Sequence, residues 1–273
     1  MRIDEIIRKS LEEDLGSGDI TTRYLDLDPE ICSAYMIAKA EGILAGTDIA
    51  KEVFKTVDPE LKITIYRKDG DRVRSKDEIM RVEGKAASIL QAERTALNFL
   101  QRLSGIASQT RRMVDAMAGT NTMLLDTRKT TPLLRSLEKY AVRVGGGLNH
   151  RHGLFDMIML KENHIRAAGG ITRAVSKIQM QNASYKVEVE VSNLDELAEA
   201  VAVKADRVML DNMSLKDIKA AVKRFGKKVE LEISGGVNED NIMQYAKTGV
   251  HYISSGALTH SYKSLDISLL FKE

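Results

Sequence analysis

Basic side chains follow several short apolar segments in the middle of the chain. They are Arg128, Lys129, Arg151 and Lys161, with His150 beside them. An arginine guanidinium binds a carboxylate or phosphate through two parallel hydrogen bonds, whereas a lysine ammonium acts as a compact point charge. Because such a group of cations repels itself unless an anion lies between them, we expect a small polyanionic ligand at this place.

Two acidic residues, Glu190 and Asp211, end the aliphatic runs KVEVEV and RVMLD. A carboxylate in such a position is costly if it is buried without a partner. A single acid there is commonly part of a salt bridge at the rim, but two at neighbouring strand ends favour binding of magnesium or sugar hydroxyls. Glu188 and Glu230 lie within similar runs, and the pattern leaves open whether they face outward or pair in the interior.

Two glycine-containing turns, ISGGV and SSGAL, each lead into a helical pattern near the C-terminus. Backbone N–H groups at the start of a helix can bind phosphate, and glycines let the ligand approach the backbone closely. One such turn alone more often serves chain reversal. The pair, at the last two predicted strand ends, favours a phosphate site.

The elements that position these residues are short apolar runs that alternate with amphipathic helical patterns. The runs end, at intervals of 21 to 35 residues, at Asp126, Lys161, Glu190, Asp211, Ser234 and Ser255. This alternation indicates repeated βα units and a parallel sheet. We expect a β/α barrel of six strands, or seven if residues 140–144 form one, with a doubly wound open sheet as the alternative. In such barrels the functional groups lie at the carboxyl ends of the strands, so all these side chains should face one mouth.

The first hundred residues lack this alternation. Apolar residues at helical spacing predict a helix near residues 3–11 and a long one over residues 86–117. Extended patterns bounded by glycine or a DG pair lie between them. A length of 273 residues fits one large domain or two smaller ones, since domains have roughly 100–200 residues.

Composition excludes several classes of protein. The net charge is only +2, tryptophan is absent and aromatic residues make up 5% of the chain, so neither a basic stripe nor a base-stacking surface is expected and nucleic acid is not a predicted partner. No apolar run approaches the roughly 18 residues of a membrane span, and the charged start has no signal-peptide core. The single cysteine excludes a disulfide framework. We therefore expect a cytoplasmic protein without membrane contact.

Several segments, in order along the chain, resemble the quinolinate phosphoribosyltransferase family. They are EDLGSGDITT, AERTALNFLQRLSGIA (92–107), DTRKT (126–130), GGGLNHRHGLFD (145–156), LKENH (160–164), EVEV (188–191), MLDN (209–212), LEISGGV (231–237) and SSGALTHS (254–261). The motifs are specific as a set and cover nearly the whole chain.

The resemblance implies an α/β fold with two domains. Residues 1–104 would form an N-terminal α/β sandwich, residues 105–261 an open or incomplete β/α barrel, and residues 262–273 would return to the first domain. It also implies a homodimer, with further assembly left open, in which Arg94 of the partner subunit reaches the barrel mouth.

The implied reaction joins quinolinate to 5-phosphoribosyl-1-pyrophosphate, with magnesium, and yields nicotinate mononucleotide, pyrophosphate and carbon dioxide. The quinolinate ligands implied by the resemblance are Arg128, His150, Arg151, Lys161 and, across the interface, Arg94. Lys129 would lie between quinolinate and the leaving pyrophosphate, and Glu190 and Asp211 would bind ribose hydroxyls and magnesium. The implied 5-phosphate ligands are Ser234, Gly235, Gly236, Gly256 and His260.

Two other functions fit part of the pattern. A related phosphoribosyltransferase could accept another anionic ring, but a monocarboxylate would need fewer cations than the chain supplies. A phosphate-binding barrel without turnover would not need both Glu190 and Asp211. The sequence therefore favours the decarboxylating transferase.

Overall fold

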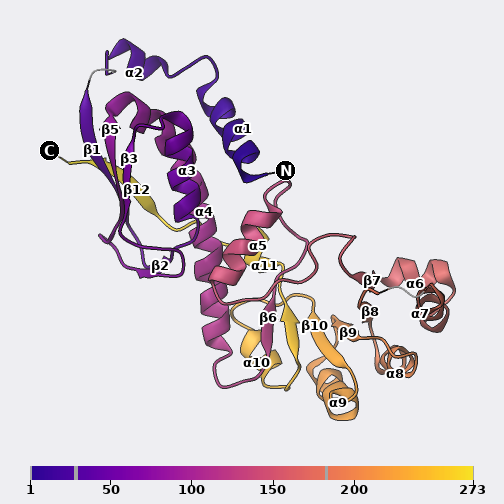
Figure 1. The fold of residues 1–273 in the computed structure, drawn as a ribbon. Helices are drawn as coiled ribbons and strands as arrows, with labels where there is room; N and C mark the ends of the chain where they lie inside the picture. The colour runs from indigo at the N-terminus through magenta and orange to yellow at the C-terminus, as the bar shows by residue number, and fades with distance from the viewer. Residues whose placement is uncertain (1, 28–29, 182–183, 273) are drawn as a thin grey trace. The chain divides into compact units, whose positions relative to one another are not determined.

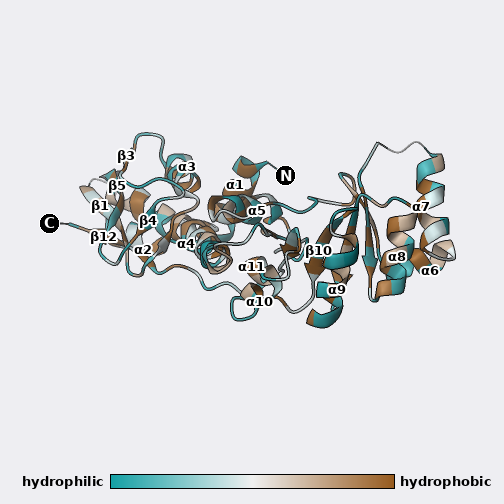
Figure 2. Ribbon diagram, turned by 90° about the horizontal axis from the view of Figure 1, so that it is seen from below, coloured by the Kyte–Doolittle hydropathy of each residue, from teal (hydrophilic) through white to brown (hydrophobic). Residues whose placement is uncertain are grey.

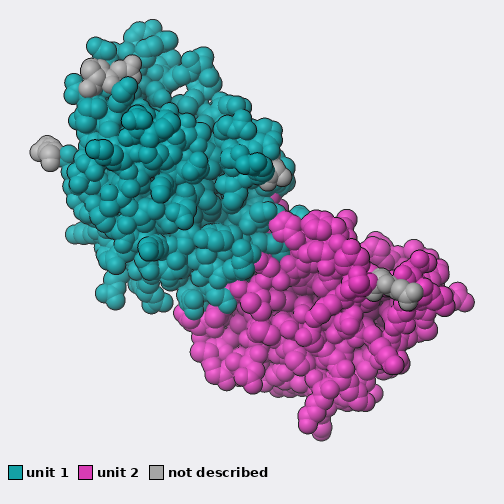
Figure 3. All heavy atoms as spheres, viewed as in Figure 1, with its two compact units in different colours: residues 1–111, 132–146, 262–273 teal, residues 112–131, 147–261 magenta. Residues whose placement is uncertain are grey.

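The computed structural model describes residues 2–27, 30–181 and 184–272, and the chain forms two compact units (Figure 3). Unit 1 comprises residues 1–111, 132–146 and 262–273, and unit 2 comprises residues 112–131 and 147–261. The division expected from the sequence assigns residues 132–146 to the barrel, whereas these units place that segment with the N-terminal residues. Among the described residues, no helix combines the length and apolar character that crossing a bilayer requires.

Unit 1 is built on an antiparallel sheet with the strand order β12-β1-β5-β3. Its strands are β1 (Ile31–Ala38), β3 (Lys62–Ile65), β5 (Glu78–Lys85) and β12 (Ile267–Phe271). The last strand of the chain thus pairs with the first, with Met36 opposite Leu269 (Figure 1). A short ladder joins β2 (Gly42–Ile43) to β4 (Arg72–Val73). The buried side chains of Met36, Met80 and Phe54 contribute to the core of this unit.

The helices of unit 1 are α1 (Ile3–Leu15), α2 (Ile20–Tyr24), α3 (Thr47–Val57), α5 (Arg135–Val144) and most of α4 (Ala86–Ala116), whose residues after 111 belong to unit 2. The long helix expected over residues 86–117 is confirmed by α4. It carries Gly105, where a Cβ atom would lie 2.3 Å from the carbonyl oxygen of Lys263. A glycine is therefore required here for the returning C-terminal segment to lie directly against the helix.

The alternative prediction of a seventh strand over residues 140–144 is wrong, because these residues belong to helix α5. Leu137 and Ala141 are both buried and lie four residues apart, so they share one face of a helix. Glu138 is fully buried on the same helix and forms an ion pair with Arg102. The apolar run YAV is too short to distinguish a strand from the buried side of a helix.

Unit 2 contains a parallel sheet with the strand order β6-β11-β10-β9-β8-β7. Its strands are β6 (Met123–Leu125), β7 (Ile158–Leu160), β8 (Val187–Val191), β9 (Arg207–Asp211), β10 (Glu230–Ser234) and β11 (Tyr252–Ser254). A single bridge between Leu125 and Leu148 continues the sheet beyond β6. Within the described residues β6 and β7 do not pair with each other, so the barrel is open. The predicted α/β class with an open barrel is confirmed.

The helices of unit 2 are α6 (Glu162–Ala168), α7 (Ile171–Met180), α8 (Leu194–Ala202), α9 (Leu215–Phe225), α10 (Ile242–Ala246) and α11 (Ala257–His260). They carry hydrophilic and hydrophobic residues on the same helix (Figure 2). Leu197 on α8 and Ile218 on α9 are fully buried. Helix α8 contacts β8 and β9, so it shields one side of these strands.

The two sides of the parallel sheet differ in polarity. Side chains alternate along a strand, so Val189, Leu210 and Ile233, which are all buried, lie on one side. The other side carries Glu188 and Glu190 on β8 and a set of charged or polar residues on the neighbouring strands. These are Arg207, Asp211, Glu230, Glu232 and Ser234. A polar barrel interior therefore leads, strand by strand, to the carboxyl ends where the candidate site lies.

Candidate active site

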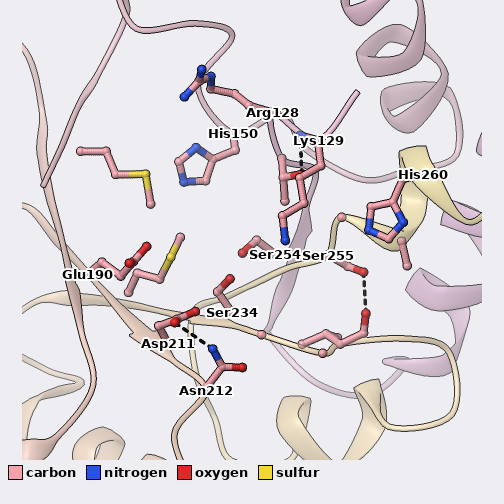
Figure 4. A pocket seen from close by; sticks show the side chains of 18 of the residues that line it. Arg128, Lys129, His150, Glu190, Asp211, Asn212, Ser234, Ser254, Ser255 and His260 are labelled. Atoms are coloured by element: carbon pink, nitrogen blue, oxygen red, sulfur yellow. Dashed lines mark hydrogen bonds between the residues drawn. The ribbon is translucent and has the colours of Figure 1, made fainter. Parts of the chain in front are cut away.

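A cavity of about 960 Å³ lies at the carboxyl ends of the strands of unit 2 (Figure 4). It is lined by all of the site residues that the sequence predicts in this unit: Arg128, Lys129, His150, Arg151, Lys161, Glu190, Asp211, Ser234, Gly235, Gly236, Gly256 and His260. Arg94 is exposed on α4 in unit 1 and is not among the described residues that line the cavity. The volume lies within the range typical of small-molecule sites, roughly 300–1,000 Å³.

One wall of the cavity, the cationic wall, carries Arg128, Lys129, His150 and Arg151. It is held in place by Asp126, which follows β6 and is fully buried. One of its carboxylate oxygens accepts the backbone N–H of His150 at 2.8 Å, and the other accepts the side-chain amide of Asn149. Asp126 thereby ties the segment carrying Arg128 and Lys129 to the segment carrying His150 and Arg151. The Thr259 hydroxyl also donates to the carbonyl of Lys129, at 2.7 Å.

Arg151 is buried beside Arg128. One of its guanidinium nitrogens donates to the carbonyl oxygen of Met157, at 3.2 Å. Burial, and then the positive charge of Arg128, lower the pKa of Arg151 from its ordinary value. Two guanidinium groups that disfavour each other's charge bind an anion more strongly than either alone. This part of the wall fits a ligand with more than one negative charge.

The acidic wall of the cavity carries Glu190 and Asp211. Lys161 and Glu190 connect the cationic wall to this acidic wall. Lys161 follows β7, Glu190 lies near the end of β8, and their side chains form an ion pair. Lys161 is half-exposed and Glu190 is mostly buried. The ammonium therefore lies at the boundary between the two charged regions of the cavity.

Asp211 and the first glycine turn are locked together through Asn212. The Asn212 amide donates to the Asp211 carboxylate at 2.8 Å, and its backbone N–H donates to the carbonyl of Ser234 at 3.0 Å. Gly235 has φ +104°, and a Cβ atom there would lie 2.1 Å from the Asn212 side-chain oxygen. Only glycine fits this close approach. Figure 4 shows Asp211, Asn212 and Ser234 together on one side of the cavity.

The two glycine turns form a further part of the wall. Gly236 has φ +61° with open space where a side chain would point. The Ser255 hydroxyl donates to the carbonyl of Val237 at 2.7 Å and so joins the two turns. A Cβ atom on Gly256 would lie 2.9 Å from both the His260 Nε2 and the Lys129 Cδ atoms. Bare backbone, a hydroxyl and an imidazole therefore meet at one end of the cavity.

A buried group of charged residues lies on the interior face of the sheet. The Nε2 atom of His150 is 2.9 Å from a carboxylate oxygen of Glu188 and 3.5 Å from one of Glu232. Desolvation raises the pKa of Glu188 to about 7, and desolvation together with the charge of Glu188 raises that of Glu232 to about 7. Arg207 donates to Glu232 at 3.2 Å and also binds Glu230. The question that the sequence left open is thus decided: Glu188 is fully buried beside His150, whereas Glu230 is partly exposed and pairs with Arg207.

Two groups of side chains could hold a metal ion. Glu190 and Asp211 offer carboxylate oxygens from adjacent strands at the cavity wall, a donor set that suits magnesium. His150, Glu188 and Glu232 place one ligand atom each within 4.8 Å of one another. Arg207, however, already supplies a positive charge to the Glu232 carboxylate oxygen that faces His150. The donor set of the cavity pair therefore suits a divalent cation better than the buried group does.

The sequence matches two family profiles that together span most of the chain. Residues 19–104 match the N-terminal domain of quinolinate phosphoribosyl transferase, and residues 106–270 match its C-terminal domain. The chain belongs to the quinolinate phosphoribosyltransferase family. The resemblance stated from the motifs is confirmed, and with it the assignment to a family of pentosyltransferases.

Individual members of the quinolinate phosphoribosyltransferase family are similar over the full length. A probable nicotinate-nucleotide pyrophosphorylase [carboxylating] of Bacillus subtilis is 42% identical over 98% of this chain and 93% of its own. The chloroplastic nicotinate-nucleotide pyrophosphorylase [carboxylating] of Arabidopsis thaliana is 44% identical over 97% of this chain and 81% of its own. The structure of the nicotinate-nucleotide pyrophosphorylase from Francisella tularensis superposes with a TM-score of 0.96, at 48% identity over 99% of this chain and 96% of that one.

Sequence reasoning missed two residues that shape the site of this family member. Asn149 and Asn212 act as linkers, each bonding to an aspartate that follows or ends a strand. The signal available for Asn212 was its place directly after Asp211 in MLDN. Asn149 carried no such signal, because the segment containing it joins the sheet only through the Leu125–Leu148 bridge.

Proposed function

We propose that the protein transfers a 5-phosphoribosyl group from 5-phosphoribosyl-1-pyrophosphate to the ring nitrogen of quinolinate, with loss of the 2-carboxylate as carbon dioxide. The products are nicotinate mononucleotide and pyrophosphate. The observation that carries this proposal is the meeting of a cationic wall, an acidic wall and two glycine turns in one cavity of unit 2. Each matches one part of the two substrates: a dicarboxylate, a ribose and a phosphate.

The dicarboxylate would bind at the cationic wall. Arg128 and Arg151 lie close enough for their charges to interact, so they can hold the quinolinate carboxylates together. Lys161 faces the same cavity from β7. The Arg94 guanidinium, exposed on α4, would be supplied by the partner subunit of a homodimer.

The phosphoribosyl donor would lie along the acidic wall. Ser234, Gly235, Gly236, Gly256 and His260 would hold its 5-phosphate, and Glu190 and Asp211 its ribose hydroxyls. As the bond from the anomeric carbon to pyrophosphate breaks and the bond to the quinolinate nitrogen forms, positive charge develops on the ribose. The two carboxylates stabilise that charge, and the ammonium of Lys129 stabilises the negative charge on the departing pyrophosphate.

Magnesium fits this assignment. Glu190 and Asp211 would hold the ion, which would neutralise part of the negative charge of the pyrophosphate. Before substrate binds, Lys161 neutralises Glu190, so the protein's own side chains keep the acidic wall in place.

The decarboxylation step needs little from the side chains. Once the ring nitrogen is ribosylated it carries a positive charge, so the electron pair left when the bond to the 2-carboxylate breaks is stabilised on the adjacent ring carbon. A proton then replaces the carboxylate. Holding the ring in place and preorganising the surrounding charges supply the catalysis.

The test is to measure pyrophosphate and carbon dioxide release from quinolinate, phosphoribosyl pyrophosphate and magnesium, with nicotinate as the parallel substrate. We expect equal release of both products from quinolinate and none from nicotinate. Pyrophosphate without carbon dioxide, or activity on nicotinate alone, would contradict the assignment of the cationic wall.

The single cysteine is consistent with the cytoplasm, where we propose that the enzyme works.

A further inference from the structure

Both ring nitrogens of the His150 imidazole lie close to polar groups of the protein. Its Nδ1 atom accepts the backbone N–H of Arg151 at 2.8 Å. Its Nε2 atom faces the carboxylates of Glu188 and Glu232, at 2.9 and 3.5 Å. A nitrogen that accepts an N–H carries a lone pair, so the proton of the neutral ring is on Nε2, close to the two carboxylates. Because Nδ1 acts as an acceptor and Nε2 is buried, neither ring nitrogen offers a donor to a substrate carboxylate.

The two carboxylates are an unusual element of a barrel interior. Glu188 and Glu232 are both fully buried, and the His150 side chain is only 6% exposed. Burying two carboxylates is costly unless other groups compensate for their charge. The charged groups that face them are Arg207 on the strand between them, with Arg151 and Lys161 further toward the cavity. An aliphatic interior of the same volume would avoid this cost, so the group has a use beyond filling space.

The use of this buried group lies in its link to Arg151, the residue that follows His150. Its backbone N–H is held by His150 Nδ1, and its guanidinium is held by the carbonyl of Met157 at 3.2 Å. Arg151 is thus held both at its backbone and at its guanidinium. Figure 4 shows the His150 ring below Arg128. A turn of this ring would break its hydrogen bond to the Arg151 backbone.

We propose that His150, Glu188 and Glu232 are positioning residues: the buried carboxylates hold the Nε2–H form of His150, and His150 in turn holds Arg151 toward the substrate dicarboxylate. This inference rests on the proposed function for the identity of the substrate. In this proposal the His150 ring does not bind a quinolinate carboxylate directly, as the family resemblance implies, but acts through Arg151. Glu188 and Glu232 become determinants of quinolinate affinity although they do not line the cavity.

Two substitutions of His150 separate the indirect role from a direct one. An asparagine places an oxygen acceptor near the position of Nδ1, whereas a glutamine places an amide donor near that of Nε2. Positioning predicts that His150→Asn keeps the KM for quinolinate within about threefold, while His150→Gln raises it about tenfold or more. The KM for phosphoribosyl pyrophosphate should change little in both variants. A larger rise in the KM for quinolinate in His150→Asn than in His150→Gln would overturn the proposal.

A double-mutant cycle tests the role of the carboxylates. Glu188→Gln should raise the KM for quinolinate in the wild-type background and have no further effect in a His150→Ala background, because its influence passes through the ring. Additive effects would refute this route. An unchanged KM for phosphoribosyl pyrophosphate and an unchanged circular dichroism spectrum serve as the check on folding.

The protonation form of His150 can be measured without any turnover. In a protein labelled with ¹⁵N-histidine, the signal that disappears in His150→Asn should show a protonated Nε2 and an unprotonated Nδ1. A protonated Nδ1 would contradict the positioning role even in an active enzyme. If the wild type instead shows the expected form but releases no carbon dioxide from quinolinate, the proposed function fails and the arrangement of the ring stands.

Discussion

Replacing Glu232 by glutamine should change how the stability of the protein depends on pH. Glu232 is fully buried, and desolvation followed by the charge of Glu188 raises its pKa from 4.5 to about 7. In the unfolded chain the same carboxyl loses its proton near its ordinary pKa. Between these two values the folded state binds more protons than the unfolded one, so stability falls as the pH rises through this window.

The size of the effect follows from the shift. Each pKa unit corresponds to about 1.4 kcal/mol, so a shift of this size represents at most about 3 kcal/mol of stability lost between pH 4.5 and 7. Glutamine keeps the shape of the side chain but does not titrate. The free energy of unfolding of Glu232→Gln should therefore rise relative to wild type, by up to about 3 kcal/mol, from pH 5 to pH 8.

The assay is urea unfolding followed by circular dichroism, at several values of pH from 5 to 8, for the wild type and Glu232→Gln. Glu52→Gln, at an exposed position on α3, is the matched control, and its curve should run parallel to that of the wild type. The reasoning is refuted if the Glu232→Gln curve also runs parallel to the wild-type curve, because the buried carboxyl would then contribute no linkage in this range.

Three further outcomes are expected. Gly235→Ala should destabilise the protein by roughly 1–3 kcal/mol more than Gly70→Ala in thermal unfolding, because both glycines have positive φ but only the former has an atom 2.1 Å from the added Cβ. Removing magnesium with a chelator should abolish pyrophosphate release, and Glu190→Gln should raise the magnesium concentration needed for half-maximal rate; an unchanged requirement would exclude Glu190 as a ligand. Arg94→Ala and Arg151→Ala should each be nearly inactive alone, and mixing the two with subunit exchange should restore activity through hybrid dimers with one intact site. No recovery in a verified hybrid would contradict an exchanged Arg94.

The outline of unit 2 could be predicted from the sequence because its signals are local. Each strand is a short aliphatic run that ends in a polar residue, and the carboxyl ends of parallel strands meet at one edge. Predicting the strands therefore predicted which side chains share the cavity, from Arg128 to His260. The glycine turns and the two acids at β8 and β9 could be identified for the same reason.

Segments whose role depends on distant partners could not be predicted in this way. Residues 135–144 form a helix in which Leu137 and Ala141 are buried, whereas the short run YAV alone fits a strand equally well. Asn149 acts through Asp126, which lies more than twenty residues earlier in the chain. Neither contact leaves a periodic pattern in the sequence.

The sequence by itself determined the family, the order of strands and helices, and the set of charged side chains at the cavity. Only the tertiary structure decided how these charges are paired. The alternation of β8 places Glu188 and Glu190 on the same side of the strand, but the depth of each residue gives Glu188 a buried histidine and Glu190 a lysine at the cavity. Pairing depends on which strands lie side by side and on how far each side chain is from water, and both follow from the packing of the whole chain.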